Sequence, residues 1–316
     1  MHLKTLTQPK RMLEILLMKY YWLFPTKIYL KLLFRLKMGY RLDLKNPKTF
    51  SEKLQWLKLY NRKPEYTKMV DKATVKDYVA DIIGSEYIIP TIGIWNTPDE
   101  IDFEQLPNQF VLKTTHGGGS SGVVICKDKT NFDTKAARKK MARSMKQDIW
   151  HVLKEWPYKD VKPRIIAETY MESSPDVNDL IDYKWYCFNG EPKYCQVIQD
   201  RKKKETIDFF DTEWNHQDFV GLIPASGPTI GSASIVPLRP KNLDIQIEIA
   251  RKLAQGMPFS RIDLYEINDK EFFGEITLYP ASGLGIFKPD QYNEILGKML
   301  TLPDIKLGGG KNCSFT

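Results

Sequence analysis

Between residues 9 and 38, apolar side chains recur every three or four positions, which predicts two amphipathic helices. One apolar stripe begins at Leu13 and the other at Ile28, with lysines and arginines between the apolar positions and Pro25 separating the helices. Such basic helices either pack on the rest of the protein through their apolar stripes or lie on a membrane surface. A turn at residues 46–50 precedes a third helix, which Thr49 or Ser51 can cap.

The remaining chain predicts helices and strands in mixed order. Alternating or continuous short apolar runs predict strands over 87–90, 110–114, 123–126, 164–169, 182–188, 193–199, 260–267 and 271–278. Helical periodicity covers 71–81, 135–154, 243–253 and 292–299, whereas 91–109 is expected to be rich in loops. The Asn189-Gly190 pair is a strong hairpin signal. These patterns predict an α+β fold in which antiparallel hairpins are prominent.

The positive charge of the chain is concentrated near its start. Residues 1–64 contain 15 Lys/Arg and 3 Asp/Glu, a net charge of +12, whereas the remainder carries −4. This segment is either a solvated basic face or a surface for anionic lipids, acidic glycans or nucleic acid. Because the body is slightly acidic and lacks a nucleic-acid motif, nucleic acid is not expected as a partner.

Two further features concern the surroundings of the protein. The apolar run Met12–Phe24 is short and contains Glu14 and Lys19, so it predicts neither a secretion signal nor a membrane span. The four cysteines form neither a zinc pattern nor a disulfide framework. We therefore expect a cytoplasmic protein, and peripheral contact of its basic segment with the inner face of the cell membrane stays open as one of the two alternatives.

A glycine-rich loop connects the strands predicted over 110–114 and 123–126. It consists of Gly117, Gly118, Gly119, Ser120, Ser121 and Gly122. Glycines allow the backbone to pack closely on a ligand, and successive N–H groups can form a phosphate nest. Lys113 enters the loop, and His116 lies at its start. The loop is neither a Walker A motif nor a dinucleotide fingerprint, because it leads into a strand. It is either a phosphate-binding flap or a long hairpin turn.

The hairpin predicted at 260–278 carries the strongest chemical signal. With residues 268–270 as its loop, Asp263 faces Glu275 and Arg261 faces Thr277, so all four side chains share one face of the sheet. Directly opposed carboxylates repel each other unless a cation or a shared proton lies between them. A divalent cation such as Mg²⁺ is the usual solution.

The other candidates come from three segments. Glu168 lies near the end of a buried strand and Glu172 follows it, and the two acids can face a base and a ribose, or lie in solvent. Asp182 and Lys184 share one face of their strand. Asp71 and Lys72 open a helix, with Lys76 one turn further on.

Together, these segments resemble the TupA-like branch of the ATP-grasp superfamily, named for teichuronopeptide synthesis and found in bacterial surface-polysaccharide gene clusters. The similarity runs from about Phe24 to Pro303. It rests on the ordered segments 46–53, 71–72, 113–122, 168–172, 182–184, 261–265 and 273–277.

The resemblance implies two α+β subdomains, 110–170 and 171–303, whose antiparallel sheets clasp ATP. They would follow a basic helical segment, 1–64, and a region of helix and linker, 65–109, and precede a disordered tail, 304–316. Lys113 would contact the α-phosphate or the adenine side, and Gly117–Gly122 would cover the outer phosphates. The stretch from Glu168 through Tyr170 to Met171 would be the hinge, and Glu172 would hold ribose.

In the same resemblance, Asp263 and Glu275 would bind Mg²⁺. Many superfamily members have asparagine where this chain has Thr277, and a threonine hydroxyl is a poorer ligand. Lys72, His116 and Asp182 are assigned to the nucleotide. Lys113, Arg261 and Lys184 are assigned to charge neutralisation during catalysis.

The resemblance implies a ligase that uses ATP to activate a carboxylate as an acyl phosphate and then forms an amide. The substrates would be an amino acid and a uronic acid of a surface polysaccharide or its precursor. Two alternatives remain open at this point. A kinase would use a hydroxyl acceptor at the same site, and a glycosyltransferase would use the acids to bind the metal of a nucleotide sugar.

Overall fold

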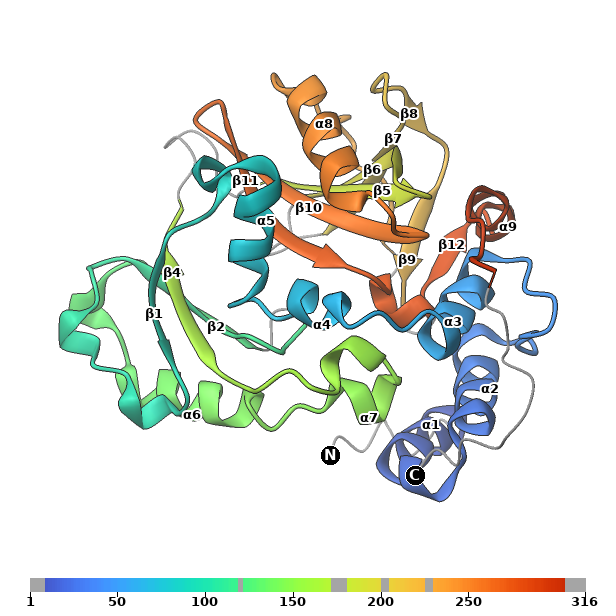
Figure 1. The fold of residues 1–316 in the computed structure, drawn as a ribbon, viewed down its shortest axis with the longest axis horizontal. Coiled ribbons are helices and arrows are strands. Elements are labelled where there is room, and N and C mark those ends of the chain that lie inside the picture. The colour runs from blue at the N-terminus through green and yellow to red at the C-terminus, as the bar shows by residue number, and fades with distance from the viewer. Residues whose placement is uncertain (1–8, 119–121, 172–180, 200–204, 225–229, 305–316) are drawn as a thin grey trace.

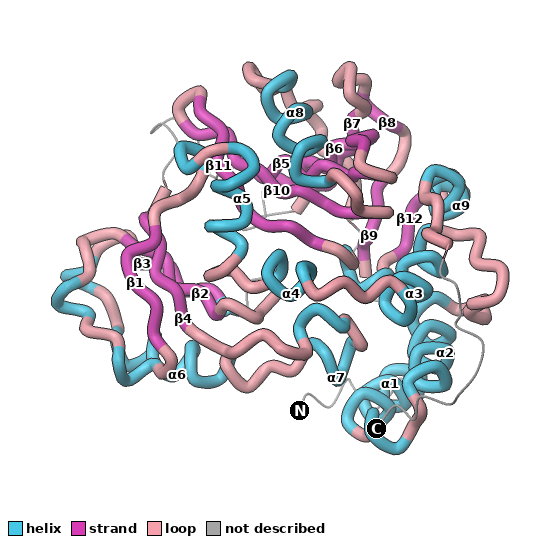
Figure 2. The backbone as a smooth tube through the Cα atoms, in the orientation of Figure 1, coloured by secondary structure: helices cyan, strands magenta, loops and turns pink. Residues whose placement is uncertain are grey.

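The strands of this protein form two separate antiparallel sheets, with helices around them (Figures 1 and 2). The computed structural model describes residues 9–118, 122–171, 181–199, 205–224 and 230–304. Four strands form one sheet, six form the other, and a two-stranded pair lies beside the larger sheet. The α+β class with antiparallel sheets is confirmed. The predicted tail, 304–316, lies almost wholly outside the described residues.

The smaller sheet has the order β1-β4-β2-β3, namely Thr91–Trp95, Ile165–Thr169, Phe110–Thr114 and Val123–Cys126. Helix α6, Thr134–Ser144, covers one face. Alternation places Phe110 and Leu112 in the core beneath α6 with Met141. The side chains of Val111 and Lys113 lie on the other face and are half-buried. The predicted strand–loop–strand unit around the glycines is therefore confirmed.

Two predictions in this region are wrong. Residues 87–90 are not a strand: Ser85–Tyr87 is a short 3₁₀ helix, and the strand β1 begins one residue after Pro90. The predicted helix 135–154 is two helices, α6 and α7, Ile149–Leu153. The break has a local cause, because the Asp148 carboxylate accepts a hydrogen bond from His151 N at 2.9 Å and thereby caps a new helix.

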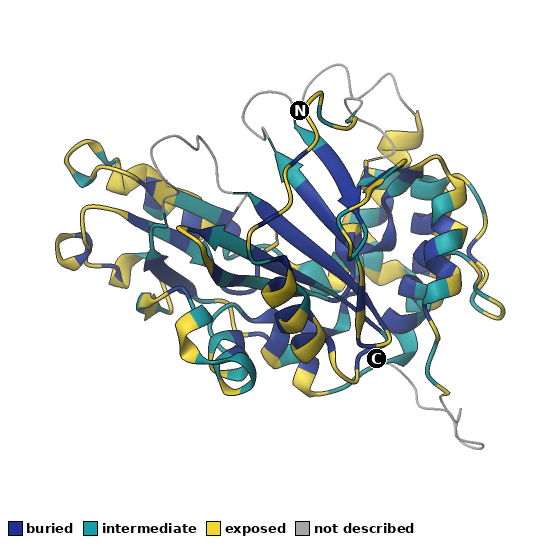
Figure 3. Cartoon of the chain, turned by 90° about the horizontal axis from the view of Figure 1, so that it is seen from above, coloured by how far each residue is buried: buried dark blue, intermediate teal, exposed yellow. Residues whose placement is uncertain are grey.

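The larger sheet has the order β11-β10-β5-β6-β7-β8. These strands are Lys270–Thr277, Phe259–Ile267, Asp182–Phe188, Glu191–Gln199, Thr206–Phe210 and His216–Gln217. Every residue of β5 is buried, and helix α8, Leu243–Ala254, packs against β5, β6 and β10. Figure 3 shows the buried strands, in dark blue, in the interior of the molecule. The strands β7, β8, β9 (Val220–Ile223) and β12 (Ile286–Lys288) are additional to those predicted, as is β1, which lies in the region 91–109 expected to be rich in loops.

The hairpin of β10 and β11 has the predicted partners but a different turn. Asn268 and Asp269 alone form the turn, both with positive φ, and Ile267 faces Lys270. A bulge at Gly274 then inserts one extra residue into β11. Because the shorter turn and the bulge offset each other, Asp263 still faces Glu275 and Arg261 still faces Thr277.

The first part of the chain is helical, as predicted. Helices α1, Pro9–Lys19, and α2, Thr26–Met38, form a hairpin at one corner of the molecule (Figure 1). Helix α3, Phe50–Tyr60, begins with a capping box in which the Thr49 side chain accepts from Glu52 N and the Glu52 side chain accepts from Thr49 N. Helices α4, Glu65–Val70, and α5, Val75–Ile83, follow, and the last helix, α9, Gln291–Met299, packs on α3.

Two expectations about the surroundings can be compared with the described part of the chain. None of its helices combines the length and apolar character needed to cross a bilayer. Cys126, Cys187 and Cys195 are buried free thiols.

A buried acid in β11 gives a test of the fold that is independent of function. Glu271 is only 3% exposed and accepts a hydrogen bond from Gln246 Nε2 at 3.0 Å. Burial, together with Glu266 and Asp269, raises its pKa from 4.5 to about 7. The folded protein therefore binds more protons than the unfolded chain between these two pKa values, and its stability falls as the pH rises through this range.

We expect Glu271→Gln to remove this loss, because the amide oxygen still accepts from Gln246 but never ionises. At pH 8 the variant should gain about 2 kcal/mol in free energy of unfolding, and at pH 4 almost nothing. Urea unfolding of both proteins across this pH range measures the difference. If the free energies of unfolding of the wild-type protein and the variant changed with pH in the same way, the raised pKa of Glu271 would be contradicted.

Candidate active site

A pocket lies where the two sheets face each other. Its walls come from β2 and β4 of the smaller sheet, from β11 of the larger sheet, and from the start of α5. Lys72, Val75, Lys76, Ile88, Ile89, Lys113, Glu168, Phe273 and Gly274 line it. Charged side chains from the smaller sheet and from residues 72–76 thus meet apolar side chains from α5, residues 88–89 and β11.

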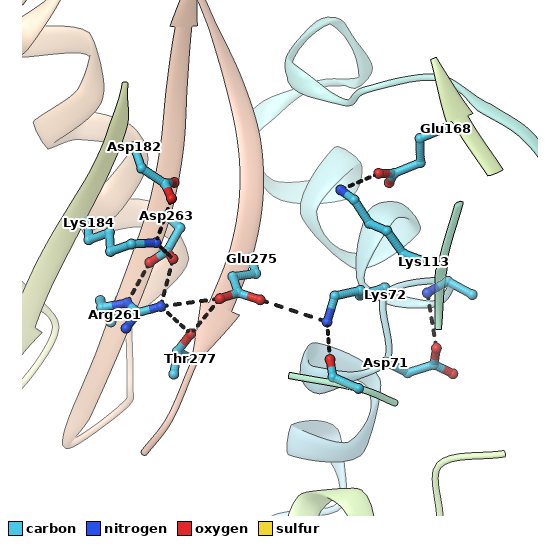
Figure 4. Close-up of polar contacts among 12 residues, drawn as sticks. Asp71, Lys72, Lys113, Glu168, Asp182, Lys184, Arg261, Asp263, Glu275 and Thr277 are labelled. Atoms are coloured by element: carbon cyan, nitrogen blue, oxygen red, sulfur yellow. Dashed lines mark hydrogen bonds and ion pairs between the residues drawn. The ribbon is translucent and has the colours of Figure 1, made fainter. Parts of the chain in front are cut away.

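The predicted pair of acids lies on β10 and β11 beside this pocket (Figure 4). Asp263 is fully buried, whereas the side chain of Glu275 is 38% exposed. Arg261 lies between them: its Nη2 is 2.7 Å from Asp263 Oδ2 and 3.2 Å from Glu275 Oε1, and it donates to Thr277 Oγ1 at 3.1 Å. The cation required between two opposed carboxylates is therefore an arginine in this structure.

The neighbouring strand β5 extends this network. Lys184 faces Asp263 in the strand register and forms an ion pair with it, and its Nζ is also 3.1 Å from Asp182 Oδ2. Both Lys184 and Asp182 are buried. Alternation along β5 puts them on one face, as predicted, and the β5–β10 pairing brings that face to Asp263. Asp182, which the sequence assigns to the nucleotide, and Lys184, which it assigns to catalysis, thus lie beside Asp263.

Lys72 connects the acids with the glycine loop. Its Nζ lies 3.8 Å from Glu275 Oε2 and donates to Gly117 O at 2.6 Å, while its backbone N–H donates to Thr115 O at 3.0 Å. Burial alone would raise the pKa of Glu275, but the charges of Lys72 and Arg261 outweigh it and lower the pKa to about 2. Glu275 is therefore ionised at every physiological pH.

The described ends of the glycine loop show why glycine stands there. A Cβ on Gly117 or on Gly122 would lie 2.5 Å from Thr114 Oγ1, which in turn is 2.9 Å from Ser144 Oγ. The loop therefore begins and ends against one buried hydroxyl pair. Gly118 is exposed. Gly119, Ser120 and Ser121 lie outside the described residues, so their contact with phosphate stays a prediction.

A second ion cluster lies on the smaller sheet. Glu168 on β4 accepts from Lys113 on β2 at 2.5 Å and from Lys76 on α5 at 2.6 Å. Burial acts to raise the pKa of Glu168, but the two ammonium groups lower it below its ordinary value. The sequence assigns no role to Lys76 beyond its position one turn after Lys72, yet Lys76 completes this cluster. Its i, i+4 spacing from Lys72 is the only local signal.

The remaining predicted residues are less closely tied to the pocket. His116 is buried at the start of the loop, and burial lowers its pKa, so it is neutral at pH 7. Tyr170 follows β4, and Lys127 Nζ lies 5.4 Å from the centre of its ring. Met171 is half-buried, and Glu172 lies outside the described residues. The roles of these four residues as nucleotide ligands stay predictions.

The donor set is suitable for a hard cation. Within the described residues, no three or more His, Cys, Asp or Glu side chains are grouped to hold a metal ion. Oxygens of Asp263, Glu275 and Thr277 lie within 3.2 Å of Nη2 of Arg261, so the guanidinium occupies the position between them and a metal ion there would require Arg261 to move aside. Two carboxylates and a hydroxyl would leave further Mg²⁺ positions for phosphate oxygens and water, which is typical of this ion.

Comparisons with solved structures give weak similarity. D-alanine–D-alanine ligase from Helicobacter pylori is 15% identical with a TM-score of 0.41, over 79% of this chain and 69% of that one. The ADP complex of N5-carboxyaminoimidazole ribonucleotide synthetase is 12% identical with a TM-score of 0.44, over 72% and 50%. The ATP-grasp ligase PsnB, with a phosphomimetic variant of its minimal precursor, Mg and ADP, is 12% identical with a TM-score of 0.39, over 79% and 65%.

The chain thus spans between half and about two thirds of the length of these structures. A search of curated protein sequences finds no significant match. The model of one protein family, described as TupA-like ATP-grasp, matches residues 52–301. This match covers most of the chain and includes both sheets and every described residue of the candidate site. The protein therefore belongs to the TupA-like family of ATP-grasp enzymes, in agreement with the resemblance seen in its sequence.

Proposed function

We propose that this protein is an ATP-dependent ligase that activates a substrate carboxylate as an acyl phosphate and joins it to an amine. The observation that carries the proposal is the directly opposed pair Asp263 and Glu275 beside a pocket lined by Lys72 and Lys113. Opposed acids provide ligands for a divalent cation, and the lysines provide counter-charges for phosphates.

The pocket suggests a position for each part of ATP. The apolar residues Ile88, Ile89 and Phe273 suit an adenine ring, and Lys113 and Lys72 lie within the same pocket for the phosphates. Asp263, Glu275 and Thr277 would hold Mg²⁺, which when bound would neutralise charge on the transferred phosphoryl group. The protein itself would mainly position the reactants and supply fixed positive charge from Lys72, Lys113 and Arg261.

For the substrates, we propose an amino acid and a uronic acid of a bacterial surface polysaccharide or its precursor. The resemblance to the teichuronopeptide branch suggests this pairing. The net charge of +12 over residues 1–64 is consistent with an acidic glycan as one partner. The carboxylate of the uronic acid is the group that ATP would activate.

The proposal is tested by ATP turnover with uronic acids paired with amino acids, in the presence of Mg²⁺ and hydroxylamine. A ligase gives an acyl phosphate that hydroxylamine traps as a hydroxamate. Glu275→Gln keeps the shape of the side chain but removes its charge, and we expect it to lower turnover at least ~100-fold. Glu191→Gln, which removes an exposed acid from β6, is the matched control and should retain wild-type turnover.

The same assay distinguishes the alternatives. A stable phosphosugar, with no trapped hydroxamate, would identify a kinase. Thermal stabilisation by UDP-sugars and not by ATP would identify a glycosyltransferase. Equal turnover by Glu275→Gln and Glu191→Gln would show that the charge of Glu275 has no role in the reaction.

A further inference from the structure

The helical hairpin α1–α2 has an unusual amount of exposed apolar surface. Nine of the fifteen exposed large hydrophobic side chains in the described chain lie between Met12 and Leu32. The most exposed are Trp22 and Leu23, at 60% and 66%, in the turn that joins the two helices. Single exposed apolar residues are ordinary, but such a concentration marks a surface that binds something.

This surface is not an unpacked core. Tyr29, Leu30, Leu33 and Phe34 already fill the interior between α1, α2 and the rest of the protein. The Tyr29 hydroxyl also donates to Val152 O at 2.6 Å, which fixes the hairpin to α7. The exposed apolar residues are therefore additional to the packed ones, which are these four on α2 and Leu17 on α1.

The exposed apolar residues are surrounded by positive charge. Residues 9–38 contain seven Lys/Arg and one acid, Glu14, which forms an ion pair with Lys37. Lys19, Lys27 and Lys31 are exposed. The hairpin thus combines apolar side chains at its tip with lysines beside them, which is the composition of a segment that lies in the interface of an anionic bilayer.

We propose that the α1–α2 hairpin docks this protein on the surface of a membrane that contains anionic lipids, with Trp22 and Leu23 entering the interface. Tryptophan favours this depth because its ring is amphipathic. The helices have 11 and 13 residues, so they lie on the bilayer and do not cross it. A second copy of the chain fits less well because two strongly positive hairpins would repel, and a glycan would not bury the exposed leucines.

The docking surface is independent of the proposed reaction, so it is tested by sedimentation with vesicles in the absence of ATP. We expect binding to phosphatidylcholine vesicles that contain phosphatidylglycerol, weaker binding as salt rises, and little binding to phosphatidylcholine alone. The double variant Trp22→Ser/Leu23→Ser should reduce binding at least ~10-fold, because both side chains lose their apolar contact. Lys27→Glu/Lys31→Glu should reduce it similarly.

The chain contains a matched control. Ile235 and Leu238 are even more exposed, at 83% and 87%, but lie outside the hairpin. Ile235→Ser/Leu238→Ser should bind vesicles like the wild-type protein, and all three variants should keep its midpoint of thermal unfolding. Equal losses in the tip and control variants, failure of the wild-type protein to bind anionic vesicles, or a dimer that the tip variant dissociates would each overturn the proposal.

Discussion

Asp263→Asn is expected to destabilise the protein by about 3 kcal/mol and to abolish ATP turnover. Asp263 is fully buried and forms ion pairs with both Arg261 and Lys184. Breaking a buried pair by removing one partner costs about 3–5 kcal/mol, because the remaining charge stays in the interior. In the variant, Arg261 still pairs with Glu275 and Lys184 still pairs with Asp182. We therefore expect a loss at the lower end of this range. Urea unfolding measures the stability.

A surface acid of the same sheet provides the comparison. Glu191 pairs with Arg251 at 3.0 Å, but both side chains are half-exposed. Glu191→Gln should therefore change the free energy of unfolding by less than about 1 kcal/mol. If Asp263→Asn lowered the free energy of unfolding no more than Glu191→Gln does, the buried ion network would not stabilise the fold.

Gly297→Ala is expected to have a similarly large effect for a purely steric reason. Helix α9 crosses the start of α3 at this glycine, and an added Cβ would overlap Lys48 O and lie 2.8 Å from both Phe50 N and Thr49 C. These are backbone atoms, so no side chain can turn away. The helix would have to move and would strain the hydrogen bond from Ser51 N to Asn293 Oδ1, now 3.0 Å long. We expect a loss of roughly 3 kcal/mol.

Gly231 is the matched control for this substitution, because nothing lies within 4 Å of its Cβ position. Gly231→Ala should leave the midpoint of thermal unfolding almost unchanged, within about 0.5 kcal/mol of the wild-type stability. Calorimetry of both variants makes the comparison. Similar midpoints for Gly297→Ala and Gly231→Ala would show that α9 can move away from α3 without loss of stability.

The sequence identifies the acid pair because its signal is local. Charged residues at every second position of two adjacent runs define one face, and a short turn brings the runs together. Even so, the agreement depends on a compensation: the turn is one residue shorter than predicted, and the Gly274 bulge restores the pairing. A count from the turn alone would otherwise have placed Asp263 opposite Gly274.

The walls of the pocket could not be predicted in the same way. Ile88, Ile89 and Phe273 meet through a bridge between Ile88 and Phe273, which are far apart in the sequence. Apolar residues that line a pocket have the same local pattern as residues that fill a core. The role of Lys76 could not be predicted either. Its partner Glu168 is far away in the sequence, and only the tertiary fold brings the two side chains together.

The short strands were missed for a related reason. The strands β8, β9 and β12 have between two and four residues, too few for alternation to be recognised. They exist because neighbouring strands supply hydrogen-bond partners and, in β9 and β12, because the fold buries apolar side chains such as Val220 and Phe287. Their formation is decided by tertiary packing and not by local preference.

The attachment of the helical hairpin has a practical consequence for any shortened form of this enzyme. Leu284, seven residues beyond Thr277, is covered by the same cluster as Tyr29 and Phe34. A fragment limited to the family match, 52–301, would uncover Leu284 and also lose Thr49, the cap of α3. The packed structure thus extends beyond the residues that the family model matches. The first helices contribute to the core of the enzyme as well as to its surface.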